Sequence, residues 1–278
     1  MTVSARRIGT SGFCFSDMRP RCLSFREPCF NSALGDRMID RVLDIQTADG
    51  VMNTFVTHPE EGGPHPVVLF YMDAPGKRGE LHDMARRLGS VGYFVVLPNL
   101  YYRRERDFRV GPSDAERQIM WDHMNSLNRT TVLTDTAAML KFADGDPAAR
   151  RGKVGVVGYC MSGPFVFWAA AEHPDRVAAA ASFHGIRLCT ADPESPHRYA
   201  NSIKAEVYVG CAQTDSYAPP EMIEALDRHL RTTPVRYRIE TYPETQHGFV
   251  FPKREGMYQK AGAERHWERL IALFRRNL

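Results

Sequence analysis

The sequence of 278 residues lacks several features that mark common classes of protein. It has no run of about 18 apolar residues, so we expect no helix that spans a membrane. Its 36 basic and 33 acidic residues leave a formal charge of only +3. The arginines are interspersed with acids rather than gathered in a basic stripe, so we expect no nucleic-acid partner. Internal repeats and low-complexity tracts are also missing from residue 38 to the end.

The cysteines exclude a further kind of site. None of the six forms a Cys-x-x-Cys pair or stands at a spacing to histidine that is typical of zinc, so we expect no metal and no other cofactor. They are Cys14, Cys22, Cys29, Cys160, Cys189 and Cys211. Cys189 and Cys211 lie in or near predicted core segments, which favours reduced, buried thiols and a cytoplasmic location.

The first 37 residues differ in character from the rest of the chain. Arginines stand there among serine, cysteine and phenylalanine with little periodicity, so we predict a poorly ordered N-terminal extension over residues 1–37. No apolar segment follows the basic start, which disfavours a secretory signal, and interspersed acids disfavour a transit peptide. Met38 is a candidate for the start of the native protein. Residues 38–278 are predicted to form one domain.

From residue 38 onward, strand and helix patterns alternate. Strands are predicted near residues 40–46, 51–57, 66–72, 93–97, 153–158, 178–183, 205–211 and 235–241. Helical spacing is found at 80–88, 113–127, 131–143, 164–172, 220–230 and 255–275. Continuous apolar strands are typical of a buried parallel sheet, and Asp49-Gly50 predicts an antiparallel hairpin at the sheet edge. The fold class is therefore α/β, with a mostly parallel central sheet of about eight strands flanked by helices on both faces.

A thiol stands in the sharp turn after one of these strands. Residues 158–162 (GYCMS) are similar to the G-x-S-x-G turn, with Cys160 at the nucleophile position and Ser162 in place of the second glycine. A side chain on such a turn projects out of the sheet, where the first N–H groups of the next helix stabilise developing negative charge. Cys160 is thus the candidate nucleophile. The alternative is a free cysteine that packs as a small hydrophobe.

An acid and a base follow the thiol in the chain. Asp215 comes directly after the strand near 205–211, and His247 follows the strand near 235–241. The order nucleophile, acid, base is that of the α/β-hydrolases, and both partners fall on loops just after strands. His184 is an alternative base, but it precedes Asp215, so the order favours His247.

Together these features resemble the dienelactone hydrolase family, which is built on an α/β-hydrolase fold. The resemblance is carried by the turn around Cys160 and by residues 213–215 (QTD) and 247–249 (HGF). It extends to residues 67–73 (VVLFYMD) and 92–101 (GYFVVLPNLY), and so covers the chain from about residue 40 to the end.

In that family a Cys-His-Asp triad opens an enol-lactone or a related ester. The resemblance implies that Cys160 attacks the carbonyl carbon, that His247 takes the thiol proton, and that Asp215 holds the imidazole in one tautomer. The expected donors to the oxyanion are the backbone N–H groups of Met161 and Ala74. Each such donor can contribute roughly 3 kcal/mol to the transition state.

An acid in the loop after residues 67–72 also recurs in the family near the nucleophile. Asp73 falls at the matching position and could tune the resting state of the Cys160 thiol by competing with His247. It could equally be an acid at a helix N-terminus, stabilised by the helix dipole. Both interpretations stay open.

The family's substrate-binding residues are matched only in part. Arg103 matches an arginine that holds a substrate carboxylate, but the second arginine, expected after the histidine, is replaced by Phe251. Asn99 stands in place of the usual aspartate. Arg103 also belongs to a mixed charge run that is typical of a solvated loop. Tyr159 and Phe249 are candidates for an aromatic pocket wall, although such residues are also common in cores.

Three hypotheses on function follow. The first is a cofactor-independent hydrolase of the carboxymethylenebutenolidase type, which cleaves a small activated ester or enol-lactone through a thiol acyl-enzyme. The second is a general carboxylesterase or thioesterase, and the third is a catalytically inactive binding protein on the same fold. The expected partner is a small-molecule ester or lactone, without nucleic acid or membrane, and the protein is expected to be a monomer or homodimer.

Overall fold

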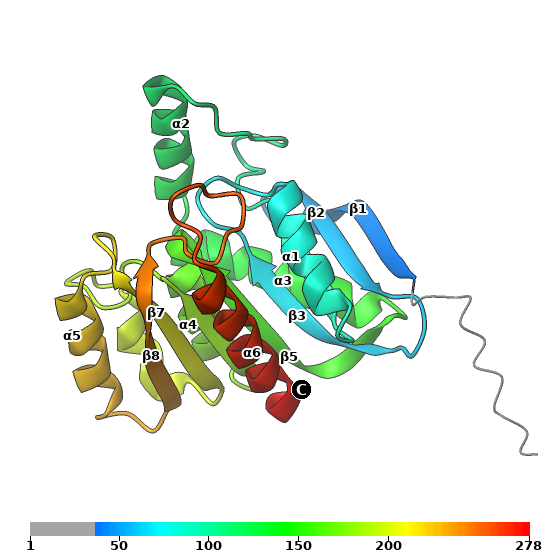
Figure 1. Ribbon diagram of the computed structural model, residues 1–278. Coiled ribbons are helices and arrows are strands. Elements are labelled where there is room, and N and C mark those ends of the chain that lie inside the picture. The colour runs from blue at the N-terminus through cyan, green and yellow to red at the C-terminus, as the bar shows by residue number, and fades with distance from the viewer. Residues whose placement is uncertain (1–36) are drawn as a thin grey trace, which may run out of the picture. The chain divides into compact units, whose positions relative to one another are not determined.

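The computed structural model describes residues 37–278. An eight-stranded sheet forms the centre of this part of the protein (Figure 1). The strands are β1 (Met38–Thr47), β2 (Gly50–Pro59), β3 (His65–Tyr71), β4 (Phe94–Pro98), β5 (Ala149–Tyr159), β6 (Val177–Phe183), β7 (Glu206–Thr214) and β8 (Arg236–Gln246). They lie in the order β1-β2-β4-β3-β5-β6-β7-β8. The predicted N-terminal extension falls outside the described residues, except for its last residue.

Most of the sheet is parallel. Strands β4, β3, β5, β6, β7 and β8 pair in parallel with their neighbours. β1 and β2 form an antiparallel hairpin closed at Thr47 and Gly50, and β2 pairs antiparallel with β4. The structure confirms the predicted fold class, and it confirms the antiparallel hairpin at the sheet edge.

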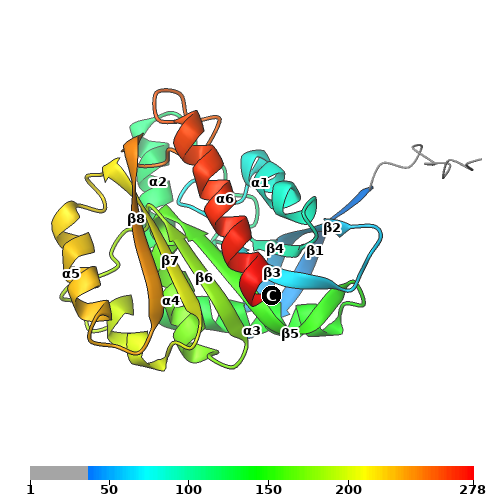
Figure 2. The ribbon, with the colours of Figure 1, turned by 60° about the horizontal axis from the view of Figure 1, so that its bottom comes forward.

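Helices cover both faces of this sheet. They are α1 (Gly79–Gly89), α2 (Asp114–Asn125), α3 (Arg129–Gly145), α4 (Gly163–Glu172), α5 (Pro220–Leu230) and α6 (Lys260–Asn277), with short 3-10 helices η1 (Cys160–Ser162) and η2 (Pro196–Ser202). Helices α1 and α6 lie on one face and α3 and α4 on the other (Figures 1 and 2). No helix within residues 37–278 is both long and apolar enough to cross a membrane.

The last helix differs from its predicted bounds. It begins at Lys260 rather than near residue 255. Pro252 and Gly256, the latter at a φ of +74°, stand in the segment before it. Neither residue favours a regular helix, so the chain forms turns there before α6 starts.

The central strands are buried, which accounts for their continuous apolar sequences. Every residue of 67–71 in β3 and of β4 is buried. Helix α6 packs closely on β5, because a Cβ atom at Gly155 would lie 2.6 Å from the ring of Phe274. Parallel strands end at the same edge of a sheet, so the loops after β3, β4, β5, β7 and β8 gather there, and ligands bind at this edge in such folds.

Candidate active site

Cys160 stands at the turn from β5 into η1 and α4. Its φ is +55°, in the left-handed region that non-glycine residues rarely adopt, and the residue is buried. Backbone strain of this kind costs about 1–3 kcal/mol and persists only where the surrounding structure enforces it. A strained turn between strand and helix is how α/β-hydrolases expose their nucleophile.

Small residues on either side make this turn possible. A Cβ atom at Gly158 would lie 2.3 Å from the carbonyl oxygen of Ser162, and one at Gly163 would lie 2.4 Å from the Cα of Gly185. Both glycines therefore allow close approach of backbone. Ser162, at the place of the second motif glycine, accepts a hydrogen bond from the backbone N–H of Tyr159 at 2.8 Å. The serine hydroxyl thus braces the turn from inside.

The acid and the base predicted from the sequence meet in the structure. The Nδ1 atom of His247 lies 2.8 Å from Oδ2 of Asp215. The other carboxylate oxygen of Asp215 accepts from the backbone N–H groups of Tyr217 and Ala218 at 2.9 and 3.1 Å. These bonds fix the carboxylate, which in turn orients the imidazole.

His247 also interacts with the thiol. Burial by itself lowers the pKa of His247, but hydrogen bonds to Asp215 and Cys160, together with the charges of both groups, raise it from 6.5 to about 9. The protonated form of His247 is therefore favoured beside the Asp215 carboxylate.

His184, the alternative base, lies behind His247 rather than against Asp215. The two imidazole rings meet edge to face with their centroids 4.8 Å apart. Burial lowers the pKa of His184 well below its usual value, and neither ring nitrogen has a hydrogen-bond partner. The histidine that bonds to Asp215 is His247.

A cavity of about 350 Å³ opens over the thiol and the imidazole. Apart from Cys160 and His247, its lining is largely apolar and aromatic. The remaining lining residues are Ala74, Pro75, Met120, Trp121, Ile186, Tyr217, Arg254, Glu255 and Met257. Helix α2 supplies Met120 and Trp121, and the segment between β8 and α6 supplies the last three.

The two residues expected to stabilise an oxyanion lie on adjoining loops. Ala74 lines the cavity, in a turn closed by a 2.9 Å hydrogen bond from the Gly76 N–H to the Asp73 carbonyl. That bond does not use the N–H of Ala74. Met161 is the second residue of η1, at the start of a helical segment, where N–H groups have no acceptor within the helix.

Asp73 is fully buried between two arginines. Its oxygens lie 2.5 Å from Nη1 of Arg78 and 2.5 Å from Nη2 of Arg254. Both guanidinium groups also lie over the ring of Phe251, at 5.3 and 4.4 Å from its centroid. A buried carboxyl group requires such partners, and the sequence analysis did not identify either arginine as a partner of Asp73. Arg254, which lines the cavity, lies beside the residue that replaces the second family arginine.

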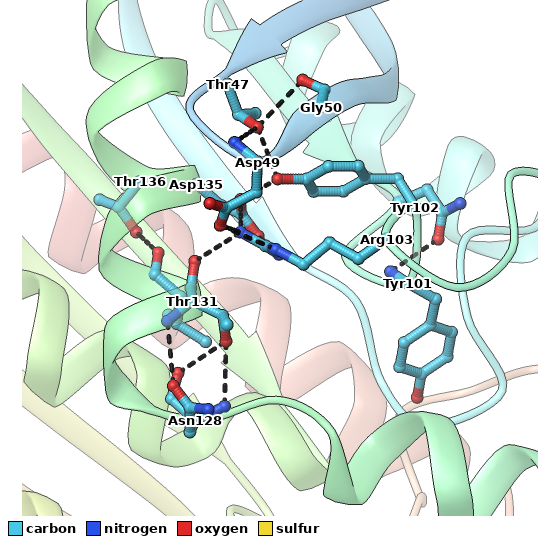
Figure 3. A network of polar contacts seen from close by, with 12 residues as sticks. Thr47, Asp49, Gly50, Tyr101, Tyr102, Arg103, Asn128, Thr131, Asp135 and Thr136 are labelled. Carbon is cyan, nitrogen blue, oxygen red and sulfur yellow. Dashed lines mark hydrogen bonds and ion pairs between the residues drawn. The ribbon is translucent and has the colours of Figure 1, made fainter.

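Arg103 is not among the residues that line the cavity, and its side chain lies beside Asp49 and Asp135 (Figure 3). Its guanidinium group contacts Asp49 at 2.6 Å and Asp135 at 2.8 Å, and it stacks over the ring of Tyr102. Asp135 is fully buried. The expectation that Arg103 holds a substrate carboxylate is not met by this geometry, because the side chain is directed to the β1–β2 turn and to α3.

The two predicted aromatic wall residues belong to the core. Tyr159 is fully buried, and its hydroxyl group lies 2.9 Å from Nε2 of His266. Phe249 is also fully buried, against the ring of Tyr242. Neither lines the cavity. Their aromatic character therefore stabilises the fold, and the wall is built by Trp121 and Tyr217.

Sequence reasoning missed most of this wall. Tyr217 stands two residues after Asp215, and Met257 follows His247 in the same connection, so nearness to the triad was an available signal. The contribution of α2 had a weaker signal, the neighbouring large apolar residues Met120 and Trp121 on a helix whose first turn is mostly polar. Nothing in one sequence shows that this helix lies over the thiol.

A thiol at a strained turn between strand and helix, followed by an acid after β7 and a histidine after β8 of a parallel sheet, defines an α/β-hydrolase. The chain belongs to the dienelactone hydrolase family, whose model matches residues 52–278. The family membership confirms the predicted resemblance and identifies the chain as a hydrolase of carboxylic ester bonds.

Similar proteins agree with this membership. A protein from Methylorubrum extorquens assigned as a carboxymethylenebutenolidase is 28% identical over 234 residues, which cover 83% of this chain and 79% of the relative. One from Synechocystis with the same assignment is 25% identical and covers 81% and 91%. At the level of the fold, a crystal structure described as a dienelactone hydrolase from Klebsiella pneumoniae superposes with a TM-score of 0.77 at 22% identity, over 86% of this chain and 99% of that one.

Proposed function

We propose that the chain is a cofactor-independent hydrolase that opens a small ester or lactone through Cys160, His247 and Asp215. One observation carries the proposal. His247 is hydrogen-bonded through Nδ1 to Asp215, and its ring and the thiol of Cys160 line the same cavity of about 350 Å³.

The reaction takes place in two halves. In the first, the thiol proton passes to His247, sulfur bonds to the carbonyl carbon, and the carbonyl electron pair moves to oxygen. When the carbonyl reforms, the bond from carbon to the alcohol oxygen breaks, and His247 protonates that oxygen. Water then attacks the thioester carbon while His247 takes a proton from it. The bond from carbon to sulfur breaks, the acid leaves, and the proton returns from His247 to the sulfur of Cys160. Asp215 stabilises the imidazolium in both halves.

The cavity supports a neutral, apolar substrate better than a carboxylate. Arg103 is held by Asp49 and Asp135 outside the lining, and Arg254 shares Asp73 with Arg78. Most of the remaining wall is apolar or aromatic, which favours burial of a hydrocarbon or aromatic group. A general carboxylesterase activity on an activated, uncharged ester therefore fits the cavity, with enol-lactones as the second candidate.

A substrate comparison tests both parts of the proposal. Wild type is expected to hydrolyse p-nitrophenyl acetate with an initial burst of one p-nitrophenol per active site, followed by slower turnover. We expect a higher kcat/KM for this neutral ester than for cis-dienelactone. The reverse preference would favour the enol-lactone, and an undiminished rate in the Cys160→Ala variant would rule out the thiol mechanism.

A further inference from the structure

The side chain of Tyr101 reaches from the loop after β4 to both loops that hold the expected oxyanion donors. Its hydroxyl group donates a hydrogen bond to the carbonyl oxygen of Ala74 at 2.8 Å. The same oxygen lies 3.2 Å from the sulfur of Met161. Tyr101 is almost completely buried, so these contacts are shielded from water. A single hydroxyl group therefore touches the two residues whose N–H groups are the expected donors.

The rest of Tyr101 is held firmly. Its backbone N–H donates to the Asn99 side chain at 3.0 Å, and its carbonyl accepts from the N–H groups of Arg104 and Glu105 at 2.8 Å each. Its ring meets that of Phe108 edge to face, with centroids 5.5 Å apart. These contacts leave the hydroxyl group little freedom before any substrate binds.

The hydroxyl group also keeps its proton. Burial raises the pKa of Tyr101 well above its usual value, and the negative charges of Asp73 and Cys160 raise it further. The group thus remains a donor to Ala74 near neutral pH.

We propose that Tyr101 is a positioning residue for the oxyanion hole, which holds the loops of Ala74 and Met161 in the arrangement that directs both N–H groups at the same oxygen. The inference rests on the proposed function. An oxyanion hole stabilises the transition state only when its donors are placed before charge develops on the oxygen. The hydroxyl group of Tyr101 does not touch the substrate in this role.

The Tyr101→Phe variant tests the proposal, because it removes the hydroxyl group and keeps the ring. With p-nitrophenyl acetate we expect the acylation rate and kcat to fall about 10-fold, less than the loss of a donor itself, while KM changes less than about 2-fold. The affinity for a trifluoromethyl ketone should fall by the same factor, because its thiol adduct carries an oxyanion. The alkaline limb of the pH profile should not move, since His247 is untouched.

Tyr102→Phe is the matched control. Tyr102 is the next residue, and its hydroxyl group bonds to Thr47 and Asp135 rather than to the expected oxyanion donors. This variant should keep the wild-type kcat and inhibitor affinity. A second test variant, Met161→Leu, removes the other contact of the Tyr101 hydroxyl group and should also lower kcat with KM unchanged.

These experiments distinguish failure of the positioning role of Tyr101 from failure of the proposed function. A Tyr101→Phe variant with wild-type kcat and inhibitor affinity, or one in which only KM changes, overturns the positioning role while the thiol mechanism stands. If Cys160→Ala hydrolyses the ester as fast as wild type, the proposed function itself fails and the oxyanion inference fails with it. Parallel losses of kcat and inhibitor affinity in Tyr101→Phe, with Tyr102→Phe at the wild-type values, support the proposal.

Discussion

Two loops at the carboxyl edge of the sheet carry residues that the family resemblance marks equally well, but their side chains lie in different surroundings. Cys160, after β5, opens into the cavity and interacts with His247. Arg103, after β4, turns to Asp49 and Asp135 instead (Figure 3). A sequence motif thus predicts where the backbone lies. The direction of a long side chain depends in addition on the charges around it.

The difference has a physical cause. The conformation of Cys160 is dictated by close contacts of backbone, such as that between Gly158 and Ser162, so its short side chain has few alternatives. Arg103 has a long flexible side chain, and the buried carboxylate of Asp135 requires a cation. That requirement arises on α3, far from Arg103 in sequence.

The largest expected effect comes from the thiol. Cys160→Ala removes the proposed nucleophile and should lower kcat/KM at least about 10³-fold. The free energy of unfolding should change by no more than about 1 kcal/mol, because a small side chain is replaced by another. Steady-state kinetics and chemical denaturation measure the two quantities. Equal losses of activity and stability would mean that Cys160 is a core residue.

The acid of the triad is expected to have the next largest effect. Asp215→Asn removes a hydrogen bond and a charge that raise the pKa of His247, and we expect kcat to fall about 10²-fold or more. In wild type, imidazolium is present below about pH 9 and is lost above it, so activity should decline there as the general acid disappears. In the variant this alkaline limb should move to lower pH. A limb at an unchanged pH would show that Asp215 does not control His247.

The raised pKa of His247 also predicts that the free energy of unfolding changes with pH. The pKa of His247 lies above its ordinary value of 6.5 in the folded protein, so its protonation stabilises the fold fully below pH 6.5. This contribution is lost as the pH rises through about 9. Denaturation of wild type and Asp215→Asn between pH 6.5 and about 9 measures this contribution. The free energy of unfolding should fall less with rising pH in the variant than in wild type.

Substitution of Arg103 should lower stability and leave activity nearly unchanged, the opposite of what we expect for Cys160. Arg103→Ala leaves the buried Asp135 without its main cation, and Tyr102 alone remains as a donor to it. Burial already raises the pKa of Asp135 although Arg103 opposes this, so the variant is expected to lose about 3 kcal/mol of stability. Its kcat/KM should stay within about 3-fold of wild type.

Arg104→Ala is the control for this variant, because Arg104 is the exposed next residue and should be neutral for both quantities. A KM for cis-dienelactone that rises in Arg103→Ala, with stability unchanged, would restore the carboxylate-binding role expected from the family resemblance.

The strands of the sheet were predictable because the sequence signal for each strand lies within a short segment. The apolar runs of β3 and β4 and the Asp49-Gly50 turn each lie in a short segment, and every predicted strand is found. The places of Asp215 and His247 were predictable for the same reason, since each residue follows a strand directly. The exception is the start of α6, where turns at Pro252 and Gly256 interrupt a helical pattern.

The cavity wall and the arginine network were not predictable, because they depend on partners distant in sequence. Arg254 reaches Asp73 across 181 residues, and Arg103 reaches Asp135 across 32. Tyr159 and Phe249 were near the right motifs but have positions that face the core. Aromatic character alone does not distinguish a wall from a core.

The smallest predicted effect concerns a residue that departs from the family pattern. Asn99 is buried, and its amide nitrogen donates to the carbonyl oxygens of Glu105 and Arg106 at 3.0 and 2.7 Å. Aspartate, usual in the family, would keep the bond from the Tyr101 N–H but would set a carboxylate against those two carbonyls. Asn99→Asp should therefore lower the free energy of unfolding by about 1–2 kcal/mol.

Asn128→Asp is the matched control for Asn99→Asp. Asn128 caps the N-terminus of α3 through its oxygen, which accepts from the Thr131 N–H at 3.0 Å, and aspartate is about as good a cap. Urea denaturation should find this control near wild type and Asn99→Asp below it. If Asn99→Asp were as stable as wild type, the loop after β4 would not depend on an amide. The placement of Tyr101 by that loop would then need another cause.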